Sequence, residues 1–315
     1  MTTKKILILE GGYNEEHEVS LQSSLEIKKI FNKINIKFKS IMVNSINFEK
    51  KISKYKNYTC FNALHGTFGE DGQIQKILKQ NNIKFTHSNF KSSKDCFDKV
   101  RTKKIISKNN ILTPKFTVLK KINLNQKKLL KLKKNYKKFV IKPAKSGSSF
   151  GIIIIKNNKD LNFFLKNIEN FKKQITNHND IIVEEFITGK ELTVSTVNFS
   201  KKIEALAVTE IKSINSFFDY QAKYSKGYAK HILPAKLSKK NYNKCLSLAL
   251  KAHKILKCNS IARSDFILDI KKNKIYFLEI NTQPGLTSIS LLPEQAKYKK
   301  RTFESIILGI LKNIN

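Results

Sequence analysis

The segment Arg263–Gly285 reads RSDFILDIKKNKIYFLEINTQPG and decides the fold class. Two runs with apolar residues at even positions, 261–270 and 275–280, flank a short polar stretch, and this pattern predicts an antiparallel hairpin. The even-numbered apolar residues of both strands are expected to face one core: Phe266, Leu268, Ile270, Tyr276, Leu278 and Ile280. Because a slip of one residue turns every side chain to the other face, paired residue numbers must then have an even sum.

A three-residue loop at 271–273 gives that register and brings polar side chains together. It pairs Asp265 with Glu279 and sets Arg263 opposite Asn281. Two carboxylates and a carboxamide on one sheet face are hard oxygen ligands that suit Mg²⁺ held with substrate phosphates. The alternative is a surface network of salt bridges. The metal site is favoured because Asn281 opens a Thr-Gln-Pro-Gly loop, where charges held for structure alone would be costly.

Outward from this hairpin, the first third of the chain alternates strands and helices. We expect strands at 6–9, 39–43 and 58–64, which predicts a parallel sheet covered on both faces. Ser20 is expected to cap a helix whose apolar stripe carries Leu21, Leu25, Ile27 and Ile30.

Later segments predict helices at about 95–109, 160–172 and 238–257, and a hairpin formed by 192–199 and 203–209. Natural joints near residues 95 and 187 suggest three domains. These are an N-terminal Rossmann-like substrate domain at 1–95, a central subdomain at 96–183 and a C-terminal subdomain at 184–315.

The sequence Gly147–Gly151, GSSFG, matches the G-x-S-x-G turn of serine hydrolases. That turn must lead into a helix, whereas 152–155 are four isoleucines, which favour a strand. The segment is better explained as a flexible flap whose backbone N–H groups approach phosphate oxygens, with Lys142 adding a positive charge. An ordinary Gly/Ser turn remains the alternative.

The composition suggests, and then argues against, a nucleic-acid partner. The 315 residues include 61 Lys and Arg against 24 Asp and Glu, a formal net charge of +37. Arg101, Arg263 and Arg301 are the only arginines, so the basic residues are almost all lysines, and they are spread along the chain. Recognition of phosphates and bases favours the planar fork of arginine. Solvated lysine faces are therefore favoured, and no nucleic-acid partner is expected.

The cysteines and the apolar runs predict a cytoplasmic protein without a membrane partner. Cys60, Cys96, Cys245 and Cys258 are far apart and are interpreted as buried thiols in a reducing compartment. The N-terminal apolar run is too short for a signal peptide. No stretch approaches the roughly 18 apolar residues of a membrane span.

Several short motifs occur together along the chain: Glu18-Val19-Ser20-Leu21, Leu64-His65-Gly66, Glu70-Asp71-Gly72, Asp98-Lys99, Lys142-Pro143, Gly147–Gly151, Asp219-Tyr220, Ala222-Lys223-Tyr224, Arg263, Asp265 and Glu279–Thr287. This set, in this order, resembles the D-alanine–D-alanine ligases of the ATP-grasp superfamily. Ala144-Lys145 and Phe150 depart from the usual residues near the flap. The resemblance implies an α/β ATP-grasp fold with an N-terminal Rossmann-like parallel-sheet domain.

The resemblance also implies the reaction, in which ATP and two D-alanines give D-alanyl-D-alanine, ADP and phosphate through an acyl phosphate, for peptidoglycan precursors. Asp265, Glu279 and Asn281 are expected to hold two Mg²⁺ ions, with Glu279 bridging and Mn²⁺ as a possible substitute. Lys99, Lys142 and Lys223 are expected on phosphates. The remaining ATP contacts are expected from Ser149, Gly151, Glu184, Phe186, Ile187 and Glu191.

For the amino acid substrates, the resemblance implies that Glu18 binds the ammonium group of the first D-alanine and that His65 lies near its carboxylate. Arg263 and the Gly285 N–H are expected to form the oxyanion site. The remaining substrate residues are Ser290 and Leu291 for the second carboxylate, and Ser148 and Tyr224 bonded to Glu18. A homodimer is expected by resemblance. The rival hypotheses are a D-alanine–D-lactate ligase, which Tyr224 disfavours, and a basic nucleic-acid-binding protein.

Overall fold

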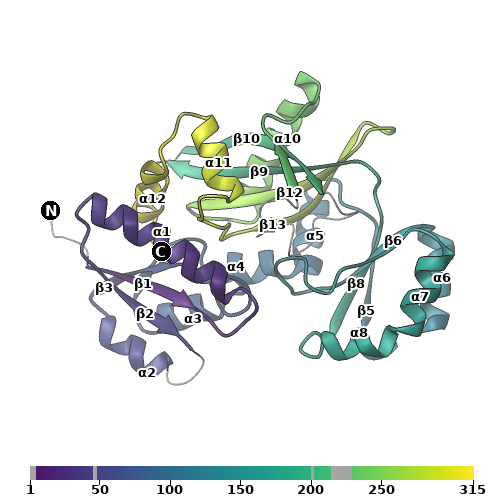
Figure 1. Ribbon diagram of the computed structural model, residues 1–315, viewed down its shortest axis with the longest axis horizontal. Helices are drawn as coiled ribbons and strands as arrows, with labels where there is room; N and C mark the ends of the chain where they lie inside the picture. Colours follow the sequence, from purple (N-terminus) through teal and green to yellow (C-terminus); the bar gives the residue numbers. More distant parts are fainter. Residues whose placement is uncertain (1–4, 45–47, 200–201, 214–228) are drawn as a thin grey trace.

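The computed structural model describes residues 5–44, 48–199, 202–213 and 229–315. They form three β-sheets, one in an N-terminal lobe, one in a central lobe and one that lies across both (Figure 1). Lys223 and Tyr224, with the neighbouring motif residues 219–222, lie outside the described residues.

The N-terminal sheet is parallel throughout, in the order β2 (Phe38–Val43), β1 (Lys5–Gly11), β3 (Tyr58–Asn62) and β4 (Lys84–Phe85). Alternate residues of β1 enter two cores. Ile6 and Ile8 pack with α1 (His17–Lys33). Leu7 and Leu9 pack with α2 (Phe48–Ile52) and α3 (Gln73–Gln80) on the other face. The predicted parallel sheet with both faces covered is confirmed.

The central sheet is antiparallel, in the order β5 (Phe116–Lys120), β8 (Asp180–Glu185), β6 (Phe139–Pro143) and β7 (Ile153–Ile155). One core joins it to α6 (Gln126–Tyr136), α7 (Asn158–Lys166) and α8 (Ile168–Gln174). The helix predicted at 160–172 is thus two helices, which meet at Asn167. Since the flap is followed by strand β7, the hydrolase turn is excluded as predicted.

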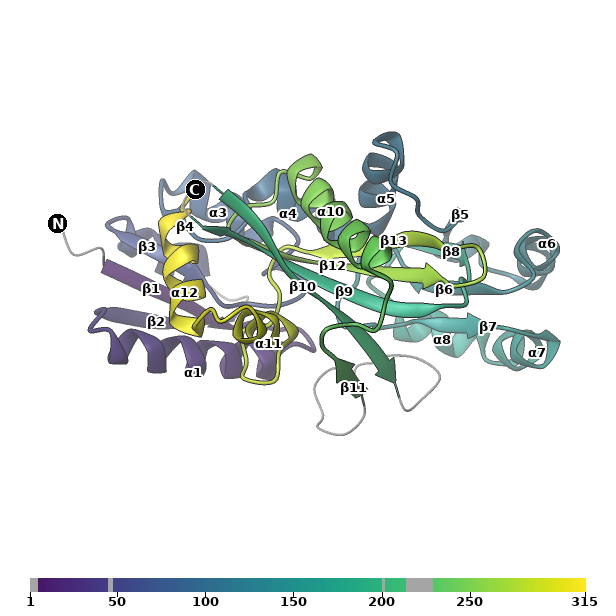
Figure 2. The same cartoon turned by 90° about the horizontal axis from the view of Figure 1, so that it is seen from above.

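The third sheet has the order β11 (Ala229–Ile232), β10 (Lys202–Ser213), β9 (Lys190–Phe199), β12 (Ile261–Asp269) and β13 (Lys274–Asn281). Helix α10 (Lys239–Ile255) packs in one core with this sheet. Helices α11 (Leu291–Tyr298) and α12 (Phe303–Lys312) pack in the same core as α1 and the Ile6 and Ile8 side chains of β1. The C-terminal helices therefore join the third sheet to the N-terminal lobe (Figure 2).

The helix predicted at 95–109 is also two helices, α4 (Phe90–Phe97) and α5 (Lys99–Lys108). Asp98 separates them, because its backbone is extended and its side chain accepts from the N–H groups of Val100 and Arg101. Short 3₁₀ turns, η1 (Ser53–Tyr55) and η2 (Lys121–Asn123), complete the elements of the described residues.

The proposed domain boundaries can be compared with this packing. The boundary between residues 183 and 184 falls inside β8. Cys96 and Ile106 share a core with α10 and the third sheet, although residues 96–183 are assigned to the central subdomain. The division into three domains at 95 and 183 remains a proposal.

The register of the β12–β13 hairpin is confirmed at its functional end, where Asp265 pairs with Glu279 and Arg263 with Asn281. The predicted loop is wrong, because Asp269 pairs with Lys274 across four residues and Ile270 is 61% exposed. A β-bulge between these two regions adds one residue to β13 and restores the even-sum register. As a result Ile275 and Phe277, and not Tyr276 and Leu278, are buried in the core.

Candidate active site

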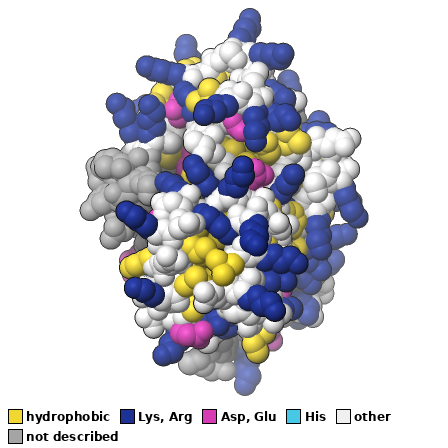
Figure 3. All heavy atoms as spheres, turned by 90° about the vertical axis from the view of Figure 1, so that its right-hand side faces the viewer, with side chains coloured by type: hydrophobic (Ala, Val, Ile, Leu, Met, Phe, Trp, Pro, Cys, Tyr) yellow, Lys and Arg dark blue, Asp and Glu magenta, His cyan; other side chains and the backbone are white. Residues whose placement is uncertain are grey.

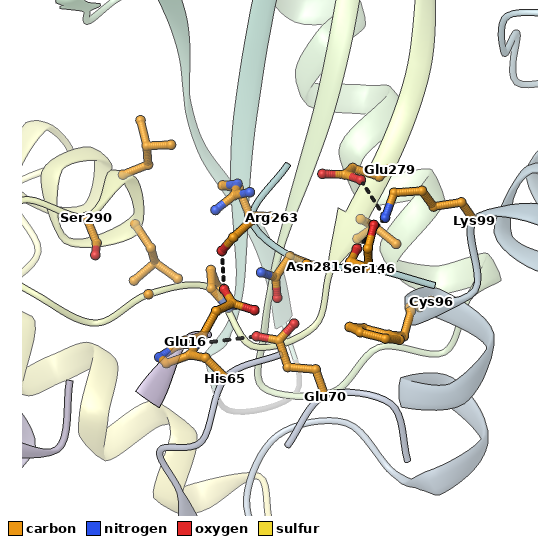
Figure 4. Close-up of a pocket in the computed structure, with 18 of the residues that line it drawn as sticks. Glu16, His65, Glu70, Cys96, Lys99, Ser146, Arg263, Glu279, Asn281 and Ser290 are labelled. Carbon is orange, nitrogen blue, oxygen red and sulfur yellow. Dashed lines mark hydrogen bonds and ion pairs between the residues drawn. The ribbon is translucent and has the colours of Figure 1, made fainter. Parts of the chain in front are cut away.

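A pocket opens where the N-terminal lobe, the flap and the third sheet meet (Figure 4). The N-terminal lobe contributes Glu16, His65 and Glu70, and α5 contributes Lys99. The third sheet and the loop after it contribute Arg263, Glu279, Asn281, Pro284, Gly285, Ser290 and Leu291. Residues that lie more than 200 positions apart in the sequence are thereby brought to one cavity.

Glu16 lies in this pocket, and its carboxylate is tightly enclosed. Its residue is only 4% exposed, and the Ser148 hydroxyl of the flap donates to Oε1. Gly66 and Gly147 approach so closely that a Cβ atom on either residue would collide with Oε2. Gly66 also has a φ of 68°, which favours glycine, and a side chain at Gly147 would displace the Glu16 carboxylate.

The predicted role of Glu18 as the partner of Ser148 is wrong. Glu18 is exposed and does not line the pocket, whereas Ser148 bonds to Glu16. The reason is the phase of α1, which begins at His17 and turns Glu18 toward solvent. Glu16 precedes the helix and faces the same side as Ser20 and Ser23, which are buried.

A second acidic side chain shares this end of the pocket. His65 Nδ1 is 3.3 Å from Glu70 Oε1, and His65 Nε2 is 3.0 Å from the Ser23 hydroxyl. Burial raises the pKa of the Glu70 carboxyl, and the nearby Glu16 charge also raises it, while the contact with His65 opposes the rise.

The paired carboxylates of β12 and β13 lie side by side, as predicted. Arg263 holds Asp265 through two bonds of 3.0 and 2.9 Å, and the Thr193 hydroxyl donates to Asp265 at 2.6 Å. Lys99 Nζ lies 3.3 Å from Glu279 and 2.5 Å from the Ser146 carbonyl oxygen. The Asn281 amide oxygen accepts from the Gln283 N–H at 2.6 Å.

This donor set fits a magnesium ion. Asp265 and Glu279 are both partly exposed and present carboxylate oxygens from neighbouring strands. Each carboxylate offers about four lone pairs, so contact with one cation does not exhaust it. In the part of the chain that the structure describes, no group of three or more His, Cys, Asp or Glu side chains is arranged to hold a metal ion, so the set depends on the Asn281 amide as its third member.

A second pocket adjoins the first and lies between the central sheet and the third sheet. It contains most of the predicted ATP residues: Lys142, Ser149, Glu184, Phe186, Ile187 and Glu191. Apolar side chains, among them those of Val140, Ile152 and Leu278, also line this pocket. Glu279 lines both pockets, and consecutive flap residues divide between them, with Ser148 in the first and Ser149 in the second. Gly151 lies in the flap but not in the lining of either pocket.

In the wall of the second pocket, Glu184 lies between two lysine side chains. Lys142 Nζ is 2.5 Å from one carboxylate oxygen, and the fully buried Lys103 is 2.8 Å from the other. Burial alone would raise the pKa of Glu184, but the two lysines outweigh it and lower the pKa to about 2. Burial lowers the pKa of Lys103 to about 8, against the attraction of Glu184.

Sequence reasoning missed Lys103. Its one signal is its position four residues after Lys99, on the same face of the predicted helix. In a chain with so many lysines, that spacing does not separate a buried ammonium group from a solvated one.

The far end of the first pocket is formed by the loop after β13. A Cβ atom on Gly285 would lie 2.7 Å from the Ser290 hydroxyl, so a side chain there would displace Ser290. Ser290 precedes the first turn of α11, and its hydroxyl is 2.8 Å from that of Thr287. The structure thus brings Arg263, Gly285, Ser290 and Leu291 to the same cavity, as predicted.

A family model described as the C-terminus of D-Ala–D-Ala ligases matches residues 105–312. A D-alanine–D-alanine ligase of Pelagibacter ubique is 42% identical over 99% of this chain and 98% of its own length. The chain belongs to the D-alanine–D-alanine ligase family. The predicted family and its α/β ATP-grasp fold are thereby confirmed.

Solved structures agree with this assignment. The D-alanine–D-alanine ligase of Bacillus anthracis in complex with ATP has a TM-score of 0.79 at 27% identity, covering 99% of this chain and 97% of its own. The VanG D-Ala:D-Ser ligase of Enterococcus faecalis has a TM-score of 0.79 at 26% identity, covering 99% of each chain. The prediction of an ATP-dependent ligase that joins two D-alanines for peptidoglycan synthesis is confirmed.

No helix in the described part of the chain is both long and apolar enough to cross a lipid bilayer.

Proposed function

We propose that ATP occupies the pocket between the central and third sheets, and that the two D-alanines occupy the pocket beside it. The observation that carries this proposal is the shared wall, since Glu279 lines both cavities and the flap serines divide between them. A γ-phosphate reaching this wall from one side meets a carboxylate arriving from the other. The arrangement therefore supports transfer of the phosphoryl group across the wall.

Asp265, Glu279 and Asn281 would hold two Mg²⁺ ions, with Glu279 bridging and Mn²⁺ as a possible substitute. The hard oxygen donors on paired strands support this set. When bound, the ions neutralise phosphate charge that would otherwise repel a carboxylate nucleophile. Lys99 and Lys142 add positive charge from the helix and sheet on either side.

In the first step, the carboxylate oxygen of one D-alanine attacks the γ-phosphorus, and ADP leaves with the bridging oxygen. Glu16 would bind the ammonium group of this D-alanine, in the role first expected of Glu18. Its buried position and its bond from Ser148 support the change. His65 would lie near the substrate carboxylate, in an orientation fixed by Glu70 and Ser23.

In the second step, the neutral amine of the other D-alanine attacks the acyl carbonyl carbon, loses a proton, and inorganic phosphate leaves. Arg263 and the N–H of Gly285 would stabilise the oxyanion of the tetrahedral intermediate. Ser290 and Leu291 would bind the carboxylate of this acceptor. Lys223 and Tyr224 keep their predicted roles on phosphate and above the first D-alanine.

Partner and location assignments complete the proposal. The protein would act as a cytoplasmic homodimer without nucleic-acid or membrane partners. Lysine and arginine side chains are spread over the face in Figure 3 and do not form one stripe on that face. The four cysteines are free thiols, as suits a reducing compartment.

The decisive experiment measures phosphate release and dipeptide formation from ATP with D-Ala, L-Ala, D-Ser or D-lactate as the added substrates. We expect phosphate release to need D-Ala and Mg²⁺, to stop with excess EDTA and to return with Mg²⁺ or Mn²⁺. Mass spectrometry should identify D-alanyl-D-alanine as the main product. A main product of D-alanyl-D-lactate or D-alanyl-D-serine would overturn the assignment of the acceptor.

A further inference from the structure

His231 lies in the substrate pocket beside Ser290 and Leu291, and none of the roles assigned above includes it. It belongs to β11, the edge strand of the third sheet, and its side chain is 22% exposed. Its Nδ1 atom is 2.9 Å from Glu294 Oε2 on α11. The backbone N–H of Glu294 in turn donates to the Ser290 carbonyl oxygen, at 3.2 Å. The carboxylate that holds the ring is therefore one helical turn from Ser290.

The other cationic side chains of the pocket already contact carboxylates of the protein. Arg263 contacts Asp265 through two bonds, and Lys99 contacts Glu279, so both described cations lie against carboxylates. The other histidine of the pocket, His65, contacts Glu70 and Ser23 at the opposite, acidic end. Among the pocket-lining residues that the structure describes, His231 is the side chain on the α11 side that can carry positive charge.

We infer that His231, oriented by Glu294, binds the carboxylate of the second amino acid and selects an acceptor that carries one. This inference rests on the proposed function, which assigns the α11 end of the pocket to that carboxylate. In the complex the ring lies between two carboxylates, so that one ring nitrogen faces Glu294 and the other faces the substrate carboxylate.

The test compares kinetic constants for ATP, the first D-alanine and the second D-alanine in three variants. His231→Phe keeps an aromatic ring but removes both nitrogens, and Glu294→Gln removes only the orienting charge. Arg301→Gln is the matched control, because Arg301 pairs with Glu204 at 2.9 Å and joins β10 to the segment after α11 outside the pocket. Thermal unfolding of each variant checks that the fold is retained.

We expect His231→Phe to raise the KM of the second D-alanine about 10-fold, as suits the loss of a charged hydrogen bond. The KM values of ATP and of the first D-alanine should stay within about twofold of wild type. Glu294→Gln should raise the same KM by a smaller factor, and Arg301→Gln should leave it unchanged. D-Alaninamide, offered as the acceptor, should lose little in His231→Phe, since the amide makes no ion pair with the ring.

Three outcomes would decide against the inference. An unchanged KM for the second D-alanine in His231→Phe would remove the ring from the acceptor site. An equal loss for D-alanine and D-alaninamide would mean that the ring acts through structure and not through charge. Wild-type protein that forms no dipeptide would overturn the proposed function itself, and this inference with it.

Discussion

Glu184→Gln should destabilise the fold in a manner that depends on pH. Glu184 is buried between Lys103 and Lys142, at 2.8 and 2.5 Å. The amide leaves two ammonium groups without the charge that balances them, and breaking a buried pair costs about 3–5 kcal/mol. The pKa of Glu184 gives a similar magnitude, because a fall from 4.5 to about 2 in the folded protein corresponds to about 3 kcal/mol.

The sign of the pH dependence follows from the lowered pKa. The folded protein binds the carboxylate proton more weakly than the unfolded chain does, so the contribution is complete above pH 4.5. It is lost as the pH falls from 4.5 toward 2. The stability difference between wild type and Glu184→Gln should therefore be about 3 kcal/mol at pH 7 and should begin to close below pH 4.5.

Urea unfolding followed by circular dichroism, repeated from pH 7 to pH 3.5, measures this difference. Glu210→Gln is the matched control, because Glu210 is also buried but pairs with Lys190, whose side chain reaches solvent. It should lose less stability. Lys103→Met should cost at least 1 kcal/mol less in the Glu184→Gln background than in wild type. Additive effects of the two substitutions, or a loss no larger than that of Glu210→Gln, would refute the buried charge network.

Three further predictions concern activity and binding. Glu279→Gln should nearly abolish turnover while the urea midpoint stays near that of wild type, because the amide removes charge beside the phosphates; wild-type activity at saturating Mg²⁺ would make Glu279 structural. In an initial-rate assay, Glu16→Gln should raise the KM of the first D-alanine at least 10-fold, whereas Glu18→Gln should leave it within about twofold. The reverse order would return the ammonium-binding role to Glu18. Binding to mixed-sequence DNA, measured by fluorescence anisotropy, should be weak and should fall steeply between roughly 50 and 200 mM salt; sequence-specific binding at physiological salt would reopen the nucleic-acid hypothesis.

The functional end of the β12–β13 hairpin could be predicted because a two-residue period leaves few registers that bury one face. Asp265 and Glu279 therefore paired as expected. The distal half could not be predicted, since the residue that the bulge adds is Leu278, which is as apolar as Phe277 before it. Residues 275–278 are all apolar, so the sequence carries no sign that Leu278 leaves the core to line the second pocket.

The predicted boundaries of the helix at 95–109 were wrong for a related reason. The periodic pattern from 95 to 109 predicts one helix, and only the Asp98 side chain ends one helix and begins the next. An aspartate inside a helical pattern is compatible with either arrangement until its backbone conformation is known. The consequence for function is direct, because the break sets Lys99 in the first turn of α5, where its ammonium group contacts Glu279.

The choice between Glu16 and Glu18 depends on the phase of α1 at its N-terminal end, and the apolar residues show that phase only in the C-terminal half, where Ile27 and Ile30 are buried as expected. The expected apolar stripe includes Leu25, which is 53% exposed, and Ser20 lies inside the helix and is not its cap. In its N-terminal half the buried face carries Ser20, Ser23 and Ser24, whose hydroxyls contact the Ala63 carbonyl oxygen, His65 and Glu10. Serines satisfied in this way are as buried as leucines but look like a solvent face in a sequence. A helix that faces a polar site therefore reverses the usual pattern, and the carboxylate on its serine side is the one that reaches the substrate pocket.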